Sequence, residues 1–453
     1  MAHAGFSTRQ VHGARARAAD PRATPIYLTA GFRFEGFDDA AALFGGADGF
    51  AYTRVGNPTV DQVERTLADL EGGTRALLVA SGQAATTIAL LSLVSAGGHI
   101  LASTHIYEGT RGLLRDNLER FGIEVDFVDD IDDPLAWEAG IRPHTRALFA
   151  ESISNAAGRV LDVAAVAAVG RRHGIAVVVD STFATPYLLR PIEHGADVVV
   201  HSASKFLAGH GSVLGGVIVD SGRFDPVAAA EHYPHLVTRG RDGRPSAAER
   251  AGGDARIAYA RDELAPRFGP TPSPLNAFLI GQGLETLSLR VERQSATALT
   301  VARWLAAHPS VERVDHPGLP DHPSHDLARR YLPDGAGSVF TVTLAADDGV
   351  AAARRFIEAL GLITHMTHLG DVRSLALHPA STSHAHLTDG ERAAVGVHPG
   401  TVRLSIGIED VDDLIADLSR ALSAAAEADP VHGGPTALER MPADRVPADR
   451  VPA

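Results

Sequence analysis

The stretch IAVVVDSTFATPYLLRPIEHGADVVVHSASKFLAGHGSVLGG, residues 175–216, contains two short apolar runs rich in β-branched residues. The first run, Ile175–Val179, ends at Asp180, and the second, Val198–Val200, is followed by a polar segment that contains Lys205. Short apolar runs bounded by turn residues are typical of strands buried on both faces of a parallel sheet. If the two strands are parallel neighbours, Asp180 and Lys205 lie at the same edge of the sheet. Ligands bind at this edge, outside the carboxyl ends of the strands, in open α/β sheets.

Each of these two residues alone has an ordinary structural explanation. A lysine after a strand is usually a solvated surface residue, and an aspartate in that place usually caps a helix. Here a carboxylate and an amine come together with the hydroxyls of Ser202 and Ser204 and with a glycine-rich loop. This combination favours a cofactor site.

Strand and helix patterns alternate through the first half of the chain. Helical stretches such as Ala84–Val94 and Val163–Arg172 separate most of the predicted strands. Repeated β–α units indicate a doubly wound, mostly parallel sheet of the α/β class. The predicted strands before Asp180 are Ala76–Ala80, Ile100–Ser103, Val125–Val128, Ala147–Ala150 and Ile175–Val179.

The length of 453 residues is too great for one compact core, so we expect two domains. Residues 1–60 have little periodicity and predict an N-terminal arm. Residues 61–275 predict a large cofactor-binding domain. Within it, the irregular residues 220–275 predict a mobile loop or an insertion near the site.

The second half of the chain predicts a smaller domain. Residues 276–428 contain a few strands and amphipathic helices, which indicate an α+β layer. One long helix, from Pro274 toward His308, is expected to lead into this domain. Residues 429–453 repeat PADRV, have few large apolar side chains and predict a disordered tail.

Composition excludes several classes of protein. The net charge of −14 opposes non-specific binding to nucleic acid and to anionic membranes. The absence of cysteine excludes disulfides, thiolate metal sites and a cysteine nucleophile, and it fits a reducing compartment. No apolar run is long enough to span a bilayer, and the N-terminus lacks an apolar signal core. We therefore expect a cytoplasmic protein.

Ser81-Gly82-Gln83 follows a predicted strand and opens a predicted helix. The free N–H groups and the dipole of a helix N-terminus make such a turn a cradle for phosphate. A site for pyridoxal 5'-phosphate (PLP) also requires a lysine, a carboxylate for the pyridine nitrogen, an aromatic ring and an anchor for the substrate carboxylate. The chain offers Lys205, Asp180, Tyr107 and Arg403 for these requirements.

Several blocks of sequence together resemble the Cys/Met-metabolism family of PLP-dependent enzymes. The resemblance implies the type I (aspartate aminotransferase-like) fold. Within the family the chain is most similar to the O-acetylhomoserine sulfhydrylases, also called O-acetylhomoserine aminocarboxypropyltransferases. The matching blocks are YTRVGNPT at 52–59, ASGQAA at 80–85, FAESISNAAGRVLD at 149–162, VVDSTFATPY at 178–187, HSASKF at 201–206, QGLETLSLR at 282–290, RSLALHPASTSH at 373–384 and VRLSIGIED at 402–410.

This resemblance implies roles for particular residues in holding PLP. Lys205 would form the covalent link to the cofactor and then move protons, and Asp180 would pair with the pyridine nitrogen. Tyr107 would stack on the ring and assist proton movement or departure of the leaving group. The remaining cofactor contacts are implied for Gly82 and Gln83 (backbone), Ser202 and Ser204 (hydroxyls), Asn155 (side chain) and, from a neighbouring subunit, Tyr52 and Arg54.

The substrate and the reaction are implied in the same way. Arg403 and Ser374 would hold the substrate carboxylate. The implied reaction is a γ-replacement of methionine biosynthesis, in which sulfide displaces acetate from O-acetyl-L-homoserine and gives L-homocysteine. The implied assembly is a homotetramer whose sites are shared between subunits.

Departures from the family pattern leave the nucleophile open. Arg373 and Leu377 stand where γ-synthases and γ-lyases commonly have acidic residues, which argues against cystathionine as product or substrate. Glu108 stands where a glycine is usual, and Ala156 follows Asn155 where the sulfhydrylases often have proline. A different nucleophile in amino-acid or specialised metabolism, or γ-elimination of the methionine γ-lyase type, is the alternative.

Histidines raise the further alternative of a metal hydrolase. His378, His384 and His386 are close in sequence, in a chain with 22 histidines. No HExxH spacing and no nearby ligating carboxylates accompany them, so solvated imidazoles in a substrate loop are the favoured explanation, and we expect no metal. A third class is a non-catalytic protein that kept the fold. The presence of Lys205, Asp180 and Arg403 argues against it.

Overall fold

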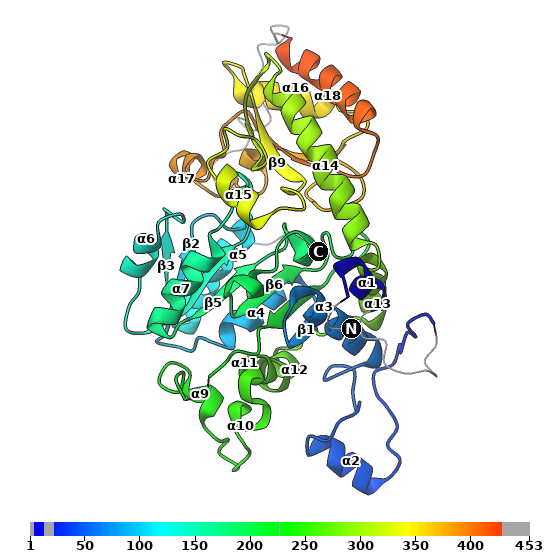
Figure 1. Cartoon of the computed structure of the whole chain (residues 1–453), viewed down its shortest axis with the longest axis vertical. Helices are drawn as coiled ribbons and strands as arrows, with labels where there is room; N and C mark the ends of the chain where they lie inside the picture. Colours follow the sequence, from blue (N-terminus) through cyan, green and yellow to red (C-terminus); the bar gives the residue numbers. More distant parts are fainter. Residues whose placement is uncertain (1–3, 13–21, 226, 428–453) are drawn as a thin grey trace, which may run out of the picture.

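The computed structural model describes residues 4–12, 22–225 and 227–427, so the predicted tail at 429–453 lies outside the described residues. A large sheet with its helices forms the centre of the molecule, and a smaller sheet lies beyond it at one end (Figure 1). Helix α14, Leu287–Ala306, runs from the large part into the smaller one. This confirms the predicted fold class, a large α/β part joined to a smaller α+β part.

Seven strands form the large sheet in the order β1-β7-β6-β5-β4-β2-β3. All neighbours from β6 to β3 are parallel, whereas β7 is antiparallel to both β1 and β6. Side chains that alternate along β5 enter two different apolar cores, because helices cover both faces of the sheet. The strands are β1 Arg75–Val79, β2 His99–Ser103, β3 Glu124–Val128, β4 Thr145–Glu151, β5 Ala176–Asp180, β6 Val198–Ser202 and β7 Gly216–Asp220.

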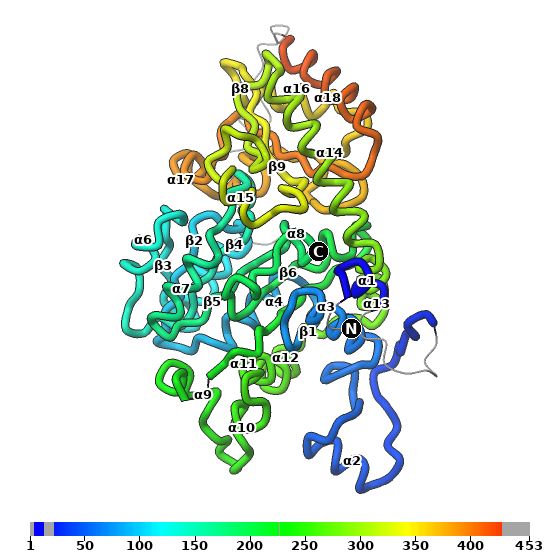
Figure 2. Tube along the Cα trace, viewed as in Figure 1, coloured from blue at the N-terminus to red at the C-terminus, as the bar shows by residue number. Residues whose placement is uncertain are grey.

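Helices precede, connect and flank these strands. The described part of the N-terminal arm projects away from the sheet and carries a short helix, α2, at its far end (Figure 2). The helices before α13 are α1 Phe6–His12, α2 Phe37–Phe44, α3 Pro58–Glu71, α4 Gly82–Leu91, α5 Glu108–Gly112, α6 Pro134–Ala139, α7 Val163–His173, α8 Thr185–Leu188, α9 Pro234–Val237, α10 Ala247–Ala251, α11 Ala255–Tyr259 and α12 Ala265–Phe268.

The smaller sheet has the strand order β10-β11-β12-β9-β8. Its apolar face packs against α14, α16 and α18 in one core of buried residues. The strands are β8 Val311–Asp315, β9 Val339–Leu344, β10 Thr364–His365, β11 Leu375–Leu377 and β12 Thr401–Ser405. The helices are α13 Pro274–Leu284, α14 Leu287–Ala306, α15 His325–Tyr331, α16 Gly349–Ala359, α17 Asp389–Ala394 and α18 Val411–Ala426. Among the described residues, none of these or the earlier helices is both long and apolar enough to cross a membrane.

The expected single helix from Pro274 toward His308 is wrong, because the chain breaks between α13 and α14. Gly283 lies so close to the backbone of residues 207–208 that an added Cβ would come within 2.4 Å of a carbonyl oxygen. The guanidinium of Arg290 donates to the carbonyl of Gly283 (2.7 Å) and to that of Phe206 (2.8 Å). The break therefore fixes α14 against the segment that follows Lys205.

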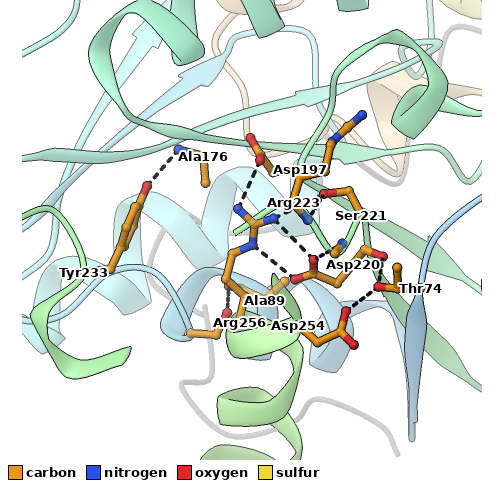
Figure 3. A network of polar contacts seen from close by, with 12 residues as sticks. Thr74, Ala89, Ala176, Asp197, Asp220, Ser221, Arg223, Tyr233, Asp254 and Arg256 are labelled. Carbon is orange, nitrogen blue, oxygen red and sulfur yellow. Dashed lines mark hydrogen bonds and ion pairs between the residues drawn. The ribbon is translucent and has the colours of Figure 1, made fainter. Parts of the chain in front are cut away.

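The sequence predicts that residues 220–275 form a loop or an insertion near the site, but residues 220–256 of this segment lie away from it. They pack at the amino ends of the parallel strands, whereas Asp180 and Lys205 lie at the carboxyl ends of β5 and β6. Figure 3 shows the polar network of this segment around Tyr233 and Arg256. The Tyr233 hydroxyl donates to the carbonyl of Arg146 at the start of β4, and Arg256 pairs with Asp197 (3.0 Å) and Asp220 (3.1 Å). The turn-rich composition of this segment concealed these buried anchors.

Candidate active site

Asp180 and Lys205 lie at the same edge of the large sheet, as predicted. β5 and β6 are parallel neighbours with Asp180 paired to Val200, and Lys205 follows β6 in the next turn. Lys205 is the only lysine in the chain. Burial and the nearby guanidinium of Arg403 lower the pKa of its amine to about 8. A free amine of that kind is well suited to form a covalent bond with an aldehyde.

Two carboxyl groups lie side by side at the ends of β4 and β5. Glu151 is directly opposite Asp180 in the sheet. Burial raises the pKa of both groups, and the charge of Asp180 raises the pKa of Glu151 further. The backbone N–H (2.9 Å) and hydroxyl (2.5 Å) of Thr182 donate to Asp180 and favour its ionised form. Asp180 is therefore the carboxylate suited to a pyridinium nitrogen.

Tyr107 is held at this edge by contacts on both sides. Its backbone N–H donates to Glu151 (2.6 Å), and the Gln83 amide donates to the carbonyl of Gly109 (2.8 Å). A Cβ at Gly109 would lie only 2.4 Å from the Tyr107 ring, so the ring packs over a position that needs glycine. The ring is 45% exposed, which leaves surface for stacking. The Gln83 side chain thus binds the segment that follows Tyr107. The sequence predicts a different role for Gln83, a cofactor contact through its backbone.

The first turn of α4 lies against the end of β6. Ser81 caps this helix by accepting from the N–H of Ala84 (3.2 Å). An added Cβ at Gly82 would come within 2.7 Å of the Cβ of Ser202, so the helix N-terminus and this serine form one surface. The hydroxyl of Ser204 instead donates to Gly215 (3.2 Å) and accepts from it (3.0 Å). Gly82 and Ser202 thus make a cradle suited to a phosphate, and Ser204 already bonds to the adjoining loop.

Arg403 is a buried cation with no carboxylate partner among the described residues. It is 5% exposed, and it donates to the side chain of Asn155 (3.3 Å) and to the carbonyl of His368 (3.1 Å). Burial lowers its pKa to about 10. Two neighbouring cations without an anion, Lys205 and Arg403, are costly unless a ligand supplies negative charge.

Three other predicted residues make hydrogen bonds or ring contacts with groups other than Lys205 and Arg403. The Ser374 hydroxyl donates to Glu409 (2.8 Å) and accepts from Gly407 (2.9 Å), so it is occupied inside the smaller domain. Tyr52 and Arg54 lie on the arm, where the guanidinium stacks on the ring at 5.4 Å and donates to the carbonyl of Pro266 (2.6 Å). The structure does not join these three residues to Lys205 within one chain.

The histidines that suggested a metal have other partners. Both ring nitrogens of His378 are hydrogen-bonded, to Ser381 (2.8 Å) and to the carbonyl of Pro399 (2.9 Å). His384 is buried, and its pKa is lowered to about 4 by burial and by neighbouring arginines. Across the described ranges, no group of three metal-ligating side chains comes together.

Two site residues escaped the sequence reasoning. The imidazole Nδ1 of His368 is 3.2 Å from the Lys205 amine, and Glu151 accepts from the backbone N–H groups of both Tyr107 and Asn155. Neither residue has a spacing that signals a role. Glu151 could have been suspected, because it directly follows the predicted strand Ala147–Ala150, as Asp180 follows the run Ile175–Val179.

The donor set fits PLP. A buried carboxylate, an amine, an anion cradle at a helix N-terminus and an exposed aromatic ring lie at one sheet edge. The family model described as "Cys/Met metabolism PLP-dependent enzyme" matches residues 7–423. The chain belongs to this family. PLP is therefore its cofactor, and the predicted family and type I fold are confirmed.

Named relatives share most of the chain. An O-acetyl-L-homoserine sulfhydrylase of Corynebacterium glutamicum is 41% identical over 431 residues, which cover 93% of this chain and 97% of the relative. A homocysteine/cysteine synthase of Saccharomyces cerevisiae is 38% identical over 92% of this chain and 97% of its own length. A crystal structure from Campylobacter jejuni, named as an O-acetylhomoserine (thiol)-lyase with N'-pyridoxyl-lysine-5'-monophosphate, superposes with a TM-score of 0.88. It is 36% identical, over 93% of this chain and all of that one.

Proposed function

We propose that this enzyme replaces the acetoxy group of O-acetyl-L-homoserine with sulfide, giving L-homocysteine and acetate. Relatives named for this activity are 41% and 42% identical to the chain. The observation that carries the proposal is the unpaired, buried guanidinium of Arg403 beside Lys205, which suits the carboxylate of an α-amino acid.

The bound cofactor supplies an electron sink that acidifies the substrate carbon atoms next to it. In this proposal Arg403 fixes the substrate by its carboxylate. Lys205 takes the proton from the α-carbon with its amine nitrogen. Loss of a proton from the β-carbon then lets acetate leave the γ-carbon, and protons return to both carbons after sulfide has added there. Asp180 keeps the pyridine nitrogen protonated, which the electron sink requires, and Tyr107 covers the ring and excludes water from one face.

The other cofactor contacts are part of the same proposal. The backbone of Gly82 and Gln83 and the hydroxyl of Ser202 bind the phosphate, and Asn155 binds the phenolic oxygen. The hydroxyl of Ser204 would join them only by giving up its bond to the carbonyl of Gly215. Tyr52 and Arg54 reach the phosphate of a neighbouring subunit in a homotetramer. Ser374 would contribute to carboxylate binding only through a change in its bonds to Glu409 and Gly407.

The domain limits at residues 60, 275 and 428 and a cytoplasmic location are also proposed. The two separate sheets support a division between the strands β7 and β8. The absence of cysteine is compatible with a reducing compartment.

A different nucleophile is the second candidate, and Glu108 is the observation that favours it. Glu108 follows Tyr107 as the first residue of α5. Its carboxylate is 3.5 Å from the guanidinium of Arg111, and burial raises its pKa. A largely buried acid at the start of α5 would disfavour hydrosulfide and could receive a neutral or cationic nucleophile.

Purified, PLP-loaded enzyme with O-acetyl-L-homoserine, with and without sulfide, tests the proposal. We expect sulfide-dependent homocysteine, identified by mass, and its loss in Lys205→Ala. Because Lys205 is the only lysine, borohydride reduction should add one cofactor mass to the wild type and none to the variant. Formation of 2-oxobutanoate that ignores sulfide would instead favour γ-elimination or another nucleophile.

A further inference from the structure

His368 is the side chain whose polar atom approaches the Lys205 amine. Its Nδ1 is 3.2 Å from the Nζ of Lys205. The loop that carries it is fixed at two points, since Gly370 donates to the Ser405 hydroxyl (3.0 Å) and Val372 donates to the carbonyl of Gly209 (2.9 Å). The imidazole therefore approaches Lys205 from a loop anchored to both domains.

The charges around this contact determine whether Lys205 or His368 donates the hydrogen bond. Burial and the positive charge of Lys205 lower the pKa of His368 to about 4, while Asp371 on the same loop acts in the other direction. Arg403 and Arg373 also face the ring and lower its pKa. The imidazole is thus neutral near pH 7, so Nδ1 accepts a hydrogen bond from the lysine and the ring hydrogen is on Nε2.

We propose that His368 is a positioning residue for Lys205, accepting a hydrogen bond from its amine whenever the amine is not bound to PLP. A lysine side chain has many rotamers, and a fixed acceptor selects the one in which Nζ faces the reacting carbon. The inference rests on the proposed role of Lys205 in moving the α-proton.

A purely structural role can be separated from this one. The main-chain carbonyl of His368 accepts from Arg403 at 3.1 Å, and that contact does not depend on the side chain. Side-chain variants should therefore keep the contact with Arg403 while they lose control of the Lys205 amine. His368→Leu removes the acceptor, and His368→Gln restores one. His365→Leu, an exposed position on β10 of the same segment, is the matched control.

The first readout is exchange of the α-proton of L-2-aminobutanoate in D₂O, followed by NMR with the PLP-loaded enzyme. This amino acid has the carbon skeleton of homoserine and no leaving group. We expect His368→Leu to slow exchange about tenfold or more, and His368→Gln and His365→Leu to stay within about threefold of wild type.

The second readout is acylation of Lys205 in the cofactor-free full chain, measured by mass after peptide mapping, which one lysine makes unambiguous. Loss of a neutral acceptor disfavours the ammonium form, so the pH midpoint of labelling should fall by about one unit in His368→Leu and recover in His368→Gln. If Leu does not fold, His368→Ala takes its place.

Wild-type exchange and an unmoved labelling midpoint in His368→Leu would overturn the inference. Equal losses in the Leu and Gln variants without a shifted midpoint would also overturn it, since they would indicate a structural role. Neither readout uses sulfide or releases acetate. Failure of homocysteine synthesis with both readouts as expected would therefore count against the proposed function alone.

Discussion

At the scale of single residues, the pair Glu151 and Asp180 has consequences for pH dependence. Glu151 has a pKa raised well above 4.5 in the folded chain, by burial and by the charge of Asp180. Because the folded state binds this proton more tightly than the unfolded state does, Glu151 stabilises the fold at acidic pH. That contribution is lost as pH rises through the folded pKa.

Glu151→Gln should remove this dependence. In the cofactor-free chain, the free energy of unfolding of wild type should fall relative to that of the variant as pH rises above 4.5, by about 1.4 kcal/mol for each unit of pKa difference. Urea unfolding across this range, monitored by circular dichroism, is the measurement. Parallel curves for the two proteins would mean that the Glu151 pKa is not raised.

At the scale of elements, helix α5 and its glycines determine where the Tyr107 ring lies. A Cβ at Gly109 would lie 2.4 Å from the Tyr107 ring, whereas a Cβ at Gly112 on the same helix meets its nearest atom, a carboxylate oxygen of Asp116, at 3.8 Å. Gly109→Ala must therefore push the ring aside, and Gly112→Ala need not.

We expect Gly109→Ala to weaken PLP binding by up to about tenfold, because aromatic stacking contributes about 0.5–1.5 kcal/mol. Gly112→Ala should bind PLP as wild type does. An absorbance titration of cofactor-free enzyme with PLP gives the dissociation constants. Equal values for the two variants would show that the ring does not stack on the cofactor.

Elements with a strong local pattern could be predicted from sequence, and elements fixed by distant contacts could not. Most of the strands from β1 to β6, such as β1 and β5, contain a continuous apolar run that is visible in the sequence. Strand β7 directly follows a glycine-rich loop, and it is not among the predicted strands. The break after α13 depends on Arg290 and on backbone near residue 207, which no pattern within the helix reveals.

The same distinction holds in the site. Asp180 and Lys205 end neighbouring strands, so topology alone brings them together. His368 is separated from Lys205 by 163 positions and is placed by a loop of the other domain. Its role could not be read from spacing, since it belongs to no local motif.

At the scale of the whole molecule, the arm presents apolar side chains to the outside. Phe37 is 89% exposed and Phe44 is 81% exposed on α2, at the far end of the arm (Figure 2). Exposed apolar surface of this kind usually marks a contact with another chain. It supports the proposal that Tyr52 and Arg54, on the same arm, complete the site of a second copy.

Mixed assemblies test this sharing. If each site takes Lys205 from one chain and Arg54 from its neighbour, an Arg54→Ala chain beside a Lys205→Ala chain contains one site with both native residues. Each variant alone should be nearly inactive, and co-expression should restore homocysteine synthesis. The matched control is Lys205→Ala with Asp180→Asn, two residues that the fold places in the same chain's site, for which no mixture restores a native site. Recovery equal to that of the control pair would place Arg54 outside the neighbouring site, and the arm would then join subunits without serving their chemistry.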